Sequence, residues 1–239
     1  MQYKHLASIY DTFIGVDYEQ WSTFISKIID KQTKTLLELG CGTGKLTTLL
    51  ANKYKVIAVD NSPEMLMQAR EKNKNIMFLE QDMSQLILHE KVDACVSTCD
   101  SINYLIEPEE LIQTFENVYK YLKPNGFFIF DINTVYKYQE ILSDNSFSYT
   151  DEKAAVIWDN TFDEESQINE YFLTIFELEE NNYYSRKEES HYQMAYTTDF
   201  IKQTLSYTGF ELVHMYDNYL EKYPKDTTER IVFVAKKKE

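Results

Sequence analysis

Short apolar runs recur along the first half of the chain, and amphipathic segments separate them. The runs are nearly continuous instead of alternating with polar residues, which is typical of parallel strands that are buried on both faces of a sheet. They lie within residues 36–39, 55–60, 75–83, 92–100 and 127–131. Strands that alternate with helices predict an α/β fold with a doubly wound, mostly parallel sheet and right-handed crossovers.

Helical periodicity marks the segments between these runs and the start of the chain. Apolar residues spaced at helical intervals predict helices that begin at Leu46 and that span residues 63–72 and 109–122. Within residues 1–30 we expect a helix with one apolar face, preceded by a break at Gly15. The members of that face are Tyr18, Trp21, Phe24, Ile25, Ile28 and Ile29.

Beyond residue 133 the pattern changes to that of antiparallel strands. Residues 154–158, 170–177 and 183–194 predict a three-stranded meander, with Asn181 and Asn182 as its one tight-turn signal. This region is rich in tyrosine, and most of its aromatic rings are expected to pack the meander onto the rest of the molecule. The remaining rings could form the wall of a pocket.

The chain is expected to end with a helix over residues 198–208 and an antiparallel hairpin formed by residues 209–213 and 228–235. With the five earlier strands, the hairpin completes a seven-stranded sheet. Arg230, in the last strand, is expected to form a surface ion pair and to have no role in a site.

These patterns divide the chain into three regions. Residues 1–32 are expected to form an N-terminal helical cap. Residues 33–133 and 197–239 are expected to form the central α/β domain. Residues 134–196 are expected to form a β-rich insertion that lies over the carboxyl ends of the sheet strands, where such sheets bind ligands.

Three alternating glycines follow the first strand, in the pattern Glu38-x-Gly40-x-Gly42-x-Gly44. Glycine lets the backbone turn sharply and lets a ligand approach where a Cβ atom would collide. The pattern is neither G-x-G-x-x-G nor the G-K-[ST] of nucleoside triphosphate sites. It therefore predicts a ligand other than a phosphate, although glycines can also simply build a turn.

Acidic residues follow the strands at their carboxyl ends. Asp60 ends the second strand about 20 residues after the glycines, which is where nucleotide-binding α/β folds place the group that accepts the two ribose hydroxyls. The alternative is an exposed acid that begins a loop. Asp82, Asp100 and Asp131 follow later strands in the same way, so a ligand site at this edge is predicted.

The net charge of −15 over 239 residues changes the range of possible partners. Without a basic surface the protein lacks the electrostatic attraction that dominates nucleic-acid binding, which argues against a nucleic-acid partner. No run approaches the roughly 18 apolar residues of a membrane span, and the first residues have no signal-peptide pattern. We therefore expect a cytoplasmic protein with no membrane contact.

The cysteines and histidines predict neither disulfides nor a metal site. Cys41, Cys95 and Cys99 are too few for a disulfide framework, and no His, Cys and Asp residues have metal-ligand spacing.

Taken together, three motifs resemble those of the class I S-adenosyl-L-methionine-dependent methyltransferases: the stretch from Glu38 to Gly44, Asp60, and the later Gln81-Asp82-Met83. The Leu-Lys-Pro-Asn-Gly stretch at residues 122–126 is similar to the turn that follows the core in that family. The resemblance covers residues 33 to about 133. It implies a Rossmann-like sheet, S-adenosyl-L-methionine as cofactor and S-adenosyl-L-homocysteine as product.

The resemblance also implies roles for residues around the methionine part of the cofactor. The backbone of Gly40 and Gly42 would lie against it, in the turn that also contains Cys41 and Gly44. Glu38 would shape the turn and reach the ligand's amino group directly or through water.

The nucleoside part of the cofactor would be held by residues from the next two strands. Asp60 would accept both ribose hydroxyls, and Asn61 or Met65 would flank the adenine ring. Asp82 would accept a hydrogen bond from the exocyclic amine, and the Met83 amide would donate to a ring nitrogen. The ligand's sulfonium suits a site rich in carboxylates, carbonyls and aromatic faces.

The stretch after the fourth strand bears on the methyl acceptor. Methylases of nucleobase amines carry Asp-Pro-Pro-Tyr or Asn-Pro-Pro-Tyr there, whereas this chain has Cys-Asp-Ser-Ile-Asn-Tyr at residues 99–104. That stretch, residues 9–11 and the insertion are similar to small-molecule methyltransferases, among them glycine-type and amino-sugar N-methyltransferases. The resemblance implies a small-molecule acceptor, with Cys99 and Asp100 facing the sulfonium and the acceptor.

Five side chains are candidates for the chemistry on the acceptor. Tyr10, Asp100, Tyr104 and Asn103 could orient it. His191 is the candidate base by its position in the insertion, and histidine as a residue type has a pKa in the range useful for a base. Tyr10 and His191 could instead be purely structural. Whether nitrogen or oxygen is methylated stays open, as do a protein or structured RNA acceptor, a non-catalytic cofactor-binding module and the oligomeric state.

Overall fold

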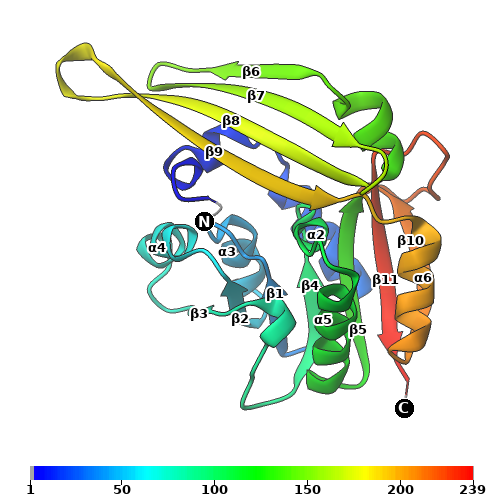
Figure 1. The fold of residues 1–239 in the computed structure, drawn as a ribbon. Coiled ribbons are helices and arrows are strands. Elements are labelled where there is room, and N and C mark those ends of the chain that lie inside the picture. Colours follow the sequence, from blue (N-terminus) through cyan, green and yellow to red (C-terminus); the bar gives the residue numbers. More distant parts are fainter. Residues whose placement is uncertain (1–2, 239) are drawn as a thin grey trace.

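A mixed sheet of seven strands forms the centre of the computed structural model, which describes residues 3–238 (Figure 1). Its strand order is β3-β2-β1-β4-β5-β11-β10. The strands are β1 (Thr35–Leu39), β2 (Lys55–Asp60), β3 (Met77–Glu80), β4 (Val92–Ser97), β5 (Leu122–Asn133), β10 (Phe210–Asp217) and β11 (Arg230–Lys237). This order and the antiparallel final hairpin confirm the predicted fold class.

The order of the strands changes direction at β1, because β2 and β3 follow on one side and β4 and β5 on the other. Strand β1 pairs in parallel with both β2 and β4. Leu37 lies opposite Ile57 on one side and Cys95 on the other, and all three side chains are buried. The carboxyl ends of β1, β2 and β4 therefore meet at one edge, and a crevice for a ligand is expected at such a reversal.

Helices cover both faces of this sheet. One face packs against α2 (Tyr18–Ile28), α3 (Lys45–Ala51) and α4 (Pro63–Lys72) through residues such as Trp21 and Leu46. The other face packs against α5 (Pro108–Tyr121) and α6 (Thr198–Tyr207) through residues such as Phe115 and Leu205. The periodicity of the apolar residues thus placed every major helix correctly.

The insertion is a separate antiparallel sheet with the order β6-β7-β8-β9. Its strands are β6 (Ser146–Thr150), β7 (Ala154–Asp163), β8 (Ile168–Leu178) and β9 (Tyr184–Met194). The expected three-stranded meander was therefore one strand short. Four of the five residues of β6 are exposed, so this strand lacks the alternation of buried and exposed residues that would have revealed it.

This second sheet lies across the carboxyl ends of the first (Figure 1). Asn103 Nδ2 donates to the carbonyl oxygen of Met194 at 2.8 Å, and Gln193 Nε2 donates to Asp100 Oδ2 at 2.6 Å. The short helices η1 (Leu6–Ser8) and α1 (Tyr10–Phe13) pack against its inner face, where Leu6 contacts the cluster around Val156. The N-terminal segment thus lies between the ligand edge and the second sheet.

The Lys-Pro-Asn-Gly stretch is a local irregularity inside β5 and does not precede the strand as expected. The register between β4 and β5 shifts here, because Val92 lies opposite Leu122 while Ala94 lies opposite Phe127. Asn125 takes a left-handed backbone conformation at φ +63°, which asparagine tolerates better than most residues.

Shorter helices complete the chain. They are η2 (Met83–Gln85), η3 (Ser101–Tyr104), the π-helix η4 (Lys137–Leu142) and η5 (Glu180–Asn182). Within residues 3–238, no helix has both the length and the apolar character to cross a membrane.

Candidate functional site

The glycine turn connects β1 to α3 and forms the floor of a cavity. Gly40, Gly42 and Gly44 all have positive φ, at +67°, +53° and +76°. A Cβ atom on Gly42 would meet nothing within 4 Å, whereas one on Gly40 would lie 2.3 Å from Ser101 Oγ. The turn therefore leaves open space above Gly42 and depends on the absence of a side chain at Gly40.

Asp60, at the end of β2, stabilises this turn through a hydrogen bond to its backbone. Its Oδ2 accepts the Gly42 N–H at 2.7 Å, and its Oδ1 accepts the Ser62 N–H at 2.9 Å. Each carboxylate oxygen has a second lone pair for a ligand hydroxyl. Burial raises the pKa of Asp60, and the backbone N–H groups of Ser62 and Gly42 act against that shift.

Glu38 lies beneath the turn with only 2% of its surface exposed. Its Oε2 has no hydrogen-bond partner among residues 3–238. Burial raises the pKa of Glu38 to about 8, and the nearby Asp60 adds to the shift. A buried carboxyl oxygen without a partner is costly, and a cationic ligand in the cavity would relieve that cost.

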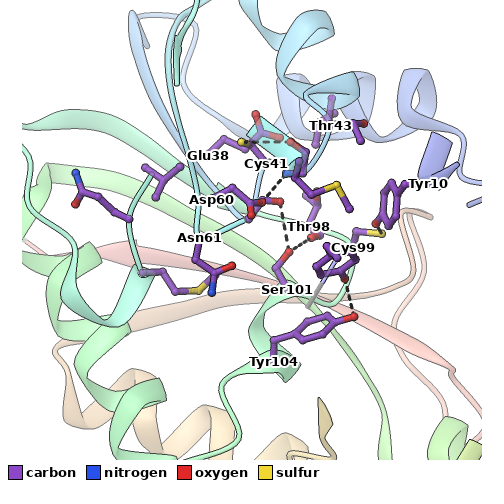
Figure 2. A pocket seen from close by; sticks show the side chains of 18 of the residues that line it. Tyr10, Glu38, Cys41, Thr43, Asp60, Asn61, Thr98, Cys99, Ser101 and Tyr104 are labelled. Atoms are coloured by element: carbon purple, nitrogen blue, oxygen red, sulfur yellow. Dashed lines mark hydrogen bonds between the residues drawn. The ribbon is translucent and has the colours of Figure 1, made fainter. Parts of the chain in front are cut away.

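These residues line a cavity of about 270 Å³, which we call the cofactor cavity. Figure 2 shows Glu38, Cys41, Asp60 and Asn61 gathered around it, with Tyr10 and Cys99 nearby. Ten of the eleven predicted cofactor-binding residues line it: Glu38, Gly40, Cys41, Gly42, Asp60, Asn61, Met65, Asp82, Met83 and Cys99.

The eleventh, Gly44, is absent from the lining. It is the N-cap of α3, where a Cβ atom would lie 3.0 Å from the Cβ of Ala69. Its place in the turn is explained by the left-handed backbone and by close packing against α4.

Asp82 and Met83 lie where β3 leads into η2. One Asp82 oxygen, Oδ1, accepts the Ser84 N–H at 2.7 Å and the Ser84 hydroxyl at 2.8 Å. The other oxygen is not used in these bonds. Met83 is the first residue of η2, so its backbone N–H has no acceptor within the helix.

The turn after β4 separates the cofactor cavity from a second one. Cys99 and Asp100 both have positive φ, at 60° and 52°. Their backbone N–H groups donate to Asp131, at 2.9 Å to Oδ2 and 2.6 Å to Oδ1. Asp131 is fully buried at the end of β5, so its carboxylate fixes this strained turn from below.

Arg230 joins the same cluster, contrary to the expected surface ion pair. Its side chain is only 12% exposed, and its Nη1 contacts Asp131 Oδ1 at 2.5 Å while its Nη2 contacts Asp100 Oδ1 at 2.6 Å. The antiparallel pairing of β11 with β5 places Arg230 opposite Asn133, beside Asp131. The Asp100 and Asp131 carboxylates keep the pKa of Arg230 raised although burial lowers it.

The second cavity, which we call the acceptor cavity, measures about 360 Å³ and lies between the N-terminal segment, the Cys99 turn and the inserted sheet. Four of the five candidates for the chemistry on the acceptor line it: Tyr10, Asp100, Tyr104 and His191. Asn103 does not, because it is fully buried and its amide bonds to Asn133 and to the carbonyl oxygen of Met194. Its remaining walls are largely aromatic and include Phe147, Tyr149, Trp158 and Tyr171. Tyr3, Tyr10, Cys99 and Tyr104 line both cavities, so the two adjoin there.

A chain of hydrogen bonds runs from β9 to this junction. Glu189 Oε1 lies 2.6 Å from His191 Nε2, and His191 Nδ1 lies 3.3 Å from the Tyr104 hydroxyl. The Tyr3 hydroxyl donates to that of Tyr104 at 2.6 Å. His191 is only 1% exposed, and its two ring nitrogens are both engaged in the chain.

The N-terminal segment is held over the cavities at two places. Glu189 accepts the backbone N–H groups of Tyr3 and His5, at 2.9 and 2.7 Å. Asp11 accepts a hydrogen bond from Thr43 Oγ1 of the glycine turn at 2.5 Å, and Lys45 Nζ donates to the Asp11 carbonyl oxygen at 2.9 Å. Tyr10 therefore closes over the cavities, and its hydroxyl lies 3.5 Å from Cys99 Sγ.

Sequence reasoning gave no site role to Tyr3, Lys137, Glu189, Gln193 or Arg230, and it named Asp131 only as one of the acids at the ligand edge. An acid within the apolar run of β5 and an arginine at the start of an apolar strand were the available signals. Among the described residues 3–238, no group of three His, Cys, Asp or Glu side chains could hold a metal ion.

Comparison with known proteins places this geometry in a family. Residues 36–126 match the family described as "Methyltransferase domain". A relative from Geobacillus sp. strain WCH70, whose name classes it as a methyltransferase, is 34% identical over 247 residues, covering 99% of this chain and 100% of the relative.

Solved structures agree with this placement. An S-adenosylmethionine-dependent methyltransferase from Clostridium acetobutylicum ATCC 824 is 34% identical, with a TM-score of 0.90 over 99% of each chain. The sugar N-methyltransferase KedS8 from Streptoalloteichus sp. ATCC 53650 shares the fold at 18% identity, with a TM-score of 0.79 over 96% of this chain and 93% of its own. The chain therefore belongs to the S-adenosylmethionine-dependent methyltransferases and is an enzyme of that family.

Proposed function

We propose that this methyltransferase transfers the methyl group of S-adenosylmethionine to a nitrogen or oxygen atom of a small molecule bound in the acceptor cavity. The observation that carries the proposal is the junction of the two cavities, where Tyr3, Tyr10, Cys99 and Tyr104 line both. The acceptor cavity, at about 360 Å³, has the size typical of small-molecule pockets.

The residues of the cofactor cavity fit the cofactor. Glu38 offers a buried, unpartnered carboxyl oxygen to its cationic amino group, and the open space above Gly42 leaves room for the methionine part. Asp60 offers its two carboxylate oxygens to the ribose hydroxyls, beside the backbone N–H groups that they already accept. Asn61 and Met65 would flank the adenine, and Asp82 and Met83 would bind its edge.

Bound there, S-adenosylmethionine supplies an activated methyl group on a sulfonium. Transfer is an in-line displacement, so the protein contributes mainly the alignment of nucleophile, methyl and sulfur. The aromatic walls and the junction residues would hold the acceptor in line. Asp100 stabilises the junction, because Arg230 and Gln193 occupy its two oxygens.

An acceptor hydroxyl or ammonium must lose a proton before or during attack. The hydrogen-bond chain provides a route, because the Tyr104 hydroxyl contacts both Tyr3 and His191. His191 Nδ1 would receive the proton through Tyr104. Glu189 at Nε2 would fix the ring's orientation and stabilise the charge that forms.

Three further observations support a small-molecule acceptor. The net charge of −15 disfavours RNA. The inserted sheet, the N-terminal segment and the Cys99 turn enclose the acceptor cavity, so we assign residues 134–196 to a substrate-covering subdomain. KedS8, which shares this fold, is named as a sugar N-methyltransferase.

The test is transfer of isotopic methyl from S-adenosylmethionine into a cell extract that is then separated into small-molecule, RNA and protein fractions. The proposal predicts label in the small-molecule fraction that disappears with Asp60→Ala, which loses the ribose contact. Label confined to RNA or protein would replace it with macromolecular methylation. Cofactor binding without label anywhere would indicate a non-catalytic module.

A further inference from the structure

Lys137 is a cation in the wall of the acceptor cavity that lacks a carboxylate partner. It begins the π-helix η4, and its Nζ donates to Asn133 Oδ1 at 3.0 Å. Among residues 3–238, no Asp or Glu oxygen lies within 4.0 Å of that nitrogen. An ammonium group has three N–H donors, so two of them remain available.

Asp100, Arg230 and His191, which also line the cavity, each contact an ionisable side chain of the opposite type. Asp100 contacts Arg230 and Gln193, and Arg230 also contacts Asp131. His191 contacts Glu189. Lys137 therefore differs from its neighbours, because within residues 3–238 its side chain bonds to an uncharged amide and to no carboxylate. Burial and the nearby Arg230 lower the pKa of Lys137, although Asp100 and Glu229 act in the opposite direction.

The position of this amide is well fixed. Asn133 is 2% exposed at the end of β5. Its backbone N–H donates to Asn103 Oδ1 at 3.0 Å, and its backbone carbonyl oxygen accepts from Asn103 Nδ2 at 3.3 Å. Asn103 is itself fully buried and bonded to the inserted sheet through Met194. The Lys137 ammonium is thus held at the cavity wall by a rigid support and does not extend freely into solvent.

We propose that Lys137 binds an anionic oxygen group, a carboxylate or a phosphate, on the methyl acceptor. Such a group would accept the two available N–H donors and place a negative charge in direct contact with the ammonium. Charge-assisted hydrogen bonds of this kind are about twice as strong as neutral ones. The aromatic wall formed by Phe147, Tyr149 and Trp158 would contact the rest of the molecule. The inference rests on the proposed function and narrows its acceptor to an anion.

The first test is the chemical identity of the product that becomes labelled in the extract. Mass spectrometry is expected to show a carboxylate or a phosphate on it, and treatment with a phosphatase distinguishes the two. A labelled product with neither group would overturn this inference while leaving the proposed function standing. Absence of any labelled small molecule would overturn the proposed function and this inference together.

The second test uses variants and the identified acceptor. Lys137→Met should raise the KM for the acceptor about 10- to 100-fold, as expected for loss of a hydrogen bond to a charged group. The Kd for S-adenosylmethionine should stay unchanged, because Lys137 is absent from the cofactor cavity lining. Lys137→Arg, which keeps the charge, should recover most of the loss.

The matched control is Lys187→Met, which removes a lysine paired with Glu177 on the inserted sheet, outside the acceptor cavity. It should leave the KM for the acceptor unchanged. Calorimetry with S-adenosylmethionine shows that each variant is folded before its kinetics are compared. An unchanged KM for a folded Lys137→Met, or an equal rise with Lys187→Met, would overturn the inference.

Discussion

Glu189 and His191 lie two residues apart on β9 and are joined at 2.6 Å, between Oε1 and Nε2. The same carboxylate accepts backbone N–H groups from Tyr3 and His5. One side chain therefore both holds the N-terminal segment over the cavities and orients the proposed base. Burial alone would raise the pKa of Glu189, but the hydrogen bonds from His191, His5 and Leu6 outweigh it and the pKa is lowered.

Replacement of Glu189 should therefore impair turnover more than cofactor binding. We expect Glu189→Gln to lower kcat about 10- to 100-fold, the usual effect of removing the group that orients a functional histidine. The Kd for S-adenosylmethionine should change little. The N-terminal segment should also become more sensitive to limited proteolysis.

The neighbouring Glu188→Gln is the matched control, because Glu188 forms a surface ion pair with Arg186. Because the pKa of Glu189 is lowered, its ionised carboxylate stabilises the folded protein above the ordinary pKa of about 4.5. This contribution to stability is lost as the pH falls below that value. Equal kinetics and equal proteolysis for the two variants would rule out the dual role.

Arg230 should contribute strongly to stability. Arg230→Met would leave the buried Asp131 and the partly buried Asp100 without their counter-charge, a change that typically costs about 3–5 kcal/mol of unfolding free energy. Urea unfolding measures this loss. Lys27→Met, which removes the exposed pair with Glu221, should change stability little because solvent screens such pairs. Similar curves for both variants would contradict the structural role of Arg230.

Glu38 should make cofactor binding depend on pH. Because its pKa is about 8 in the free protein, Glu38 is protonated below that value and must ionise to bind a cationic amino group. Affinity for S-adenosylmethionine should therefore rise about tenfold per pH unit between roughly pH 5.5 and 7, where the ligand's amino group stays charged.

Calorimetry in buffers of different ionisation enthalpy should show release of about one proton at pH 6.5. Glu38→Gln should abolish both the release and the slope. The folding stability of the free protein should depend on pH in the opposite direction. The raised pKa of Glu38 stabilises the folded state below about pH 4.5, and this contribution to stability is lost as the pH rises through 8. A pH-independent affinity in the wild-type protein would disprove the contact.

Gly42→Ala tests the cavity floor. At φ +53° any side chain is strained, which costs about 1–2 kcal/mol, and the added methyl would enter the space expected to hold the methionine part. The Kd for S-adenosylmethionine should rise clearly. Gly15→Ala is the control, since Gly15 has no positive φ and open space around it. Unchanged cofactor binding by the Gly42 variant would place the ligand elsewhere.

Much of the central fold followed from local signals. Buried parallel strands such as β1 and β2 are short continuous apolar runs, and the helices between them show clear periodicity. The glycine turn and Asp60 are also local features, and ten of the residues predicted to bind the cofactor line the cofactor cavity. Strand β6 was not predicted, because its residues are mostly exposed and it lies at the edge of the inserted sheet, paired with β7.

The acceptor side was less predictable because it is built from contacts distant in sequence. Arg230 meets Asp100 across 130 positions, and Tyr3 meets Glu189 across 186. Only the antiparallel register of β11 against β5 reveals that Arg230 lies inward. Lys137 gave no signal at all, since a lysine without a nearby carboxylate is identified only by its surroundings.

The most direct measurement is a crystal structure of the protein with S-adenosylhomocysteine. Our account predicts the ribose on Asp60, the adenine between Met65 and Asp82, and the sulfur atom at the junction, facing the acceptor cavity beside Cys99 and Tyr104. A ligand bound in the cofactor cavity with its sulfur turned away from that junction, or bound outside the cavity, would contradict the proposed path of methyl transfer.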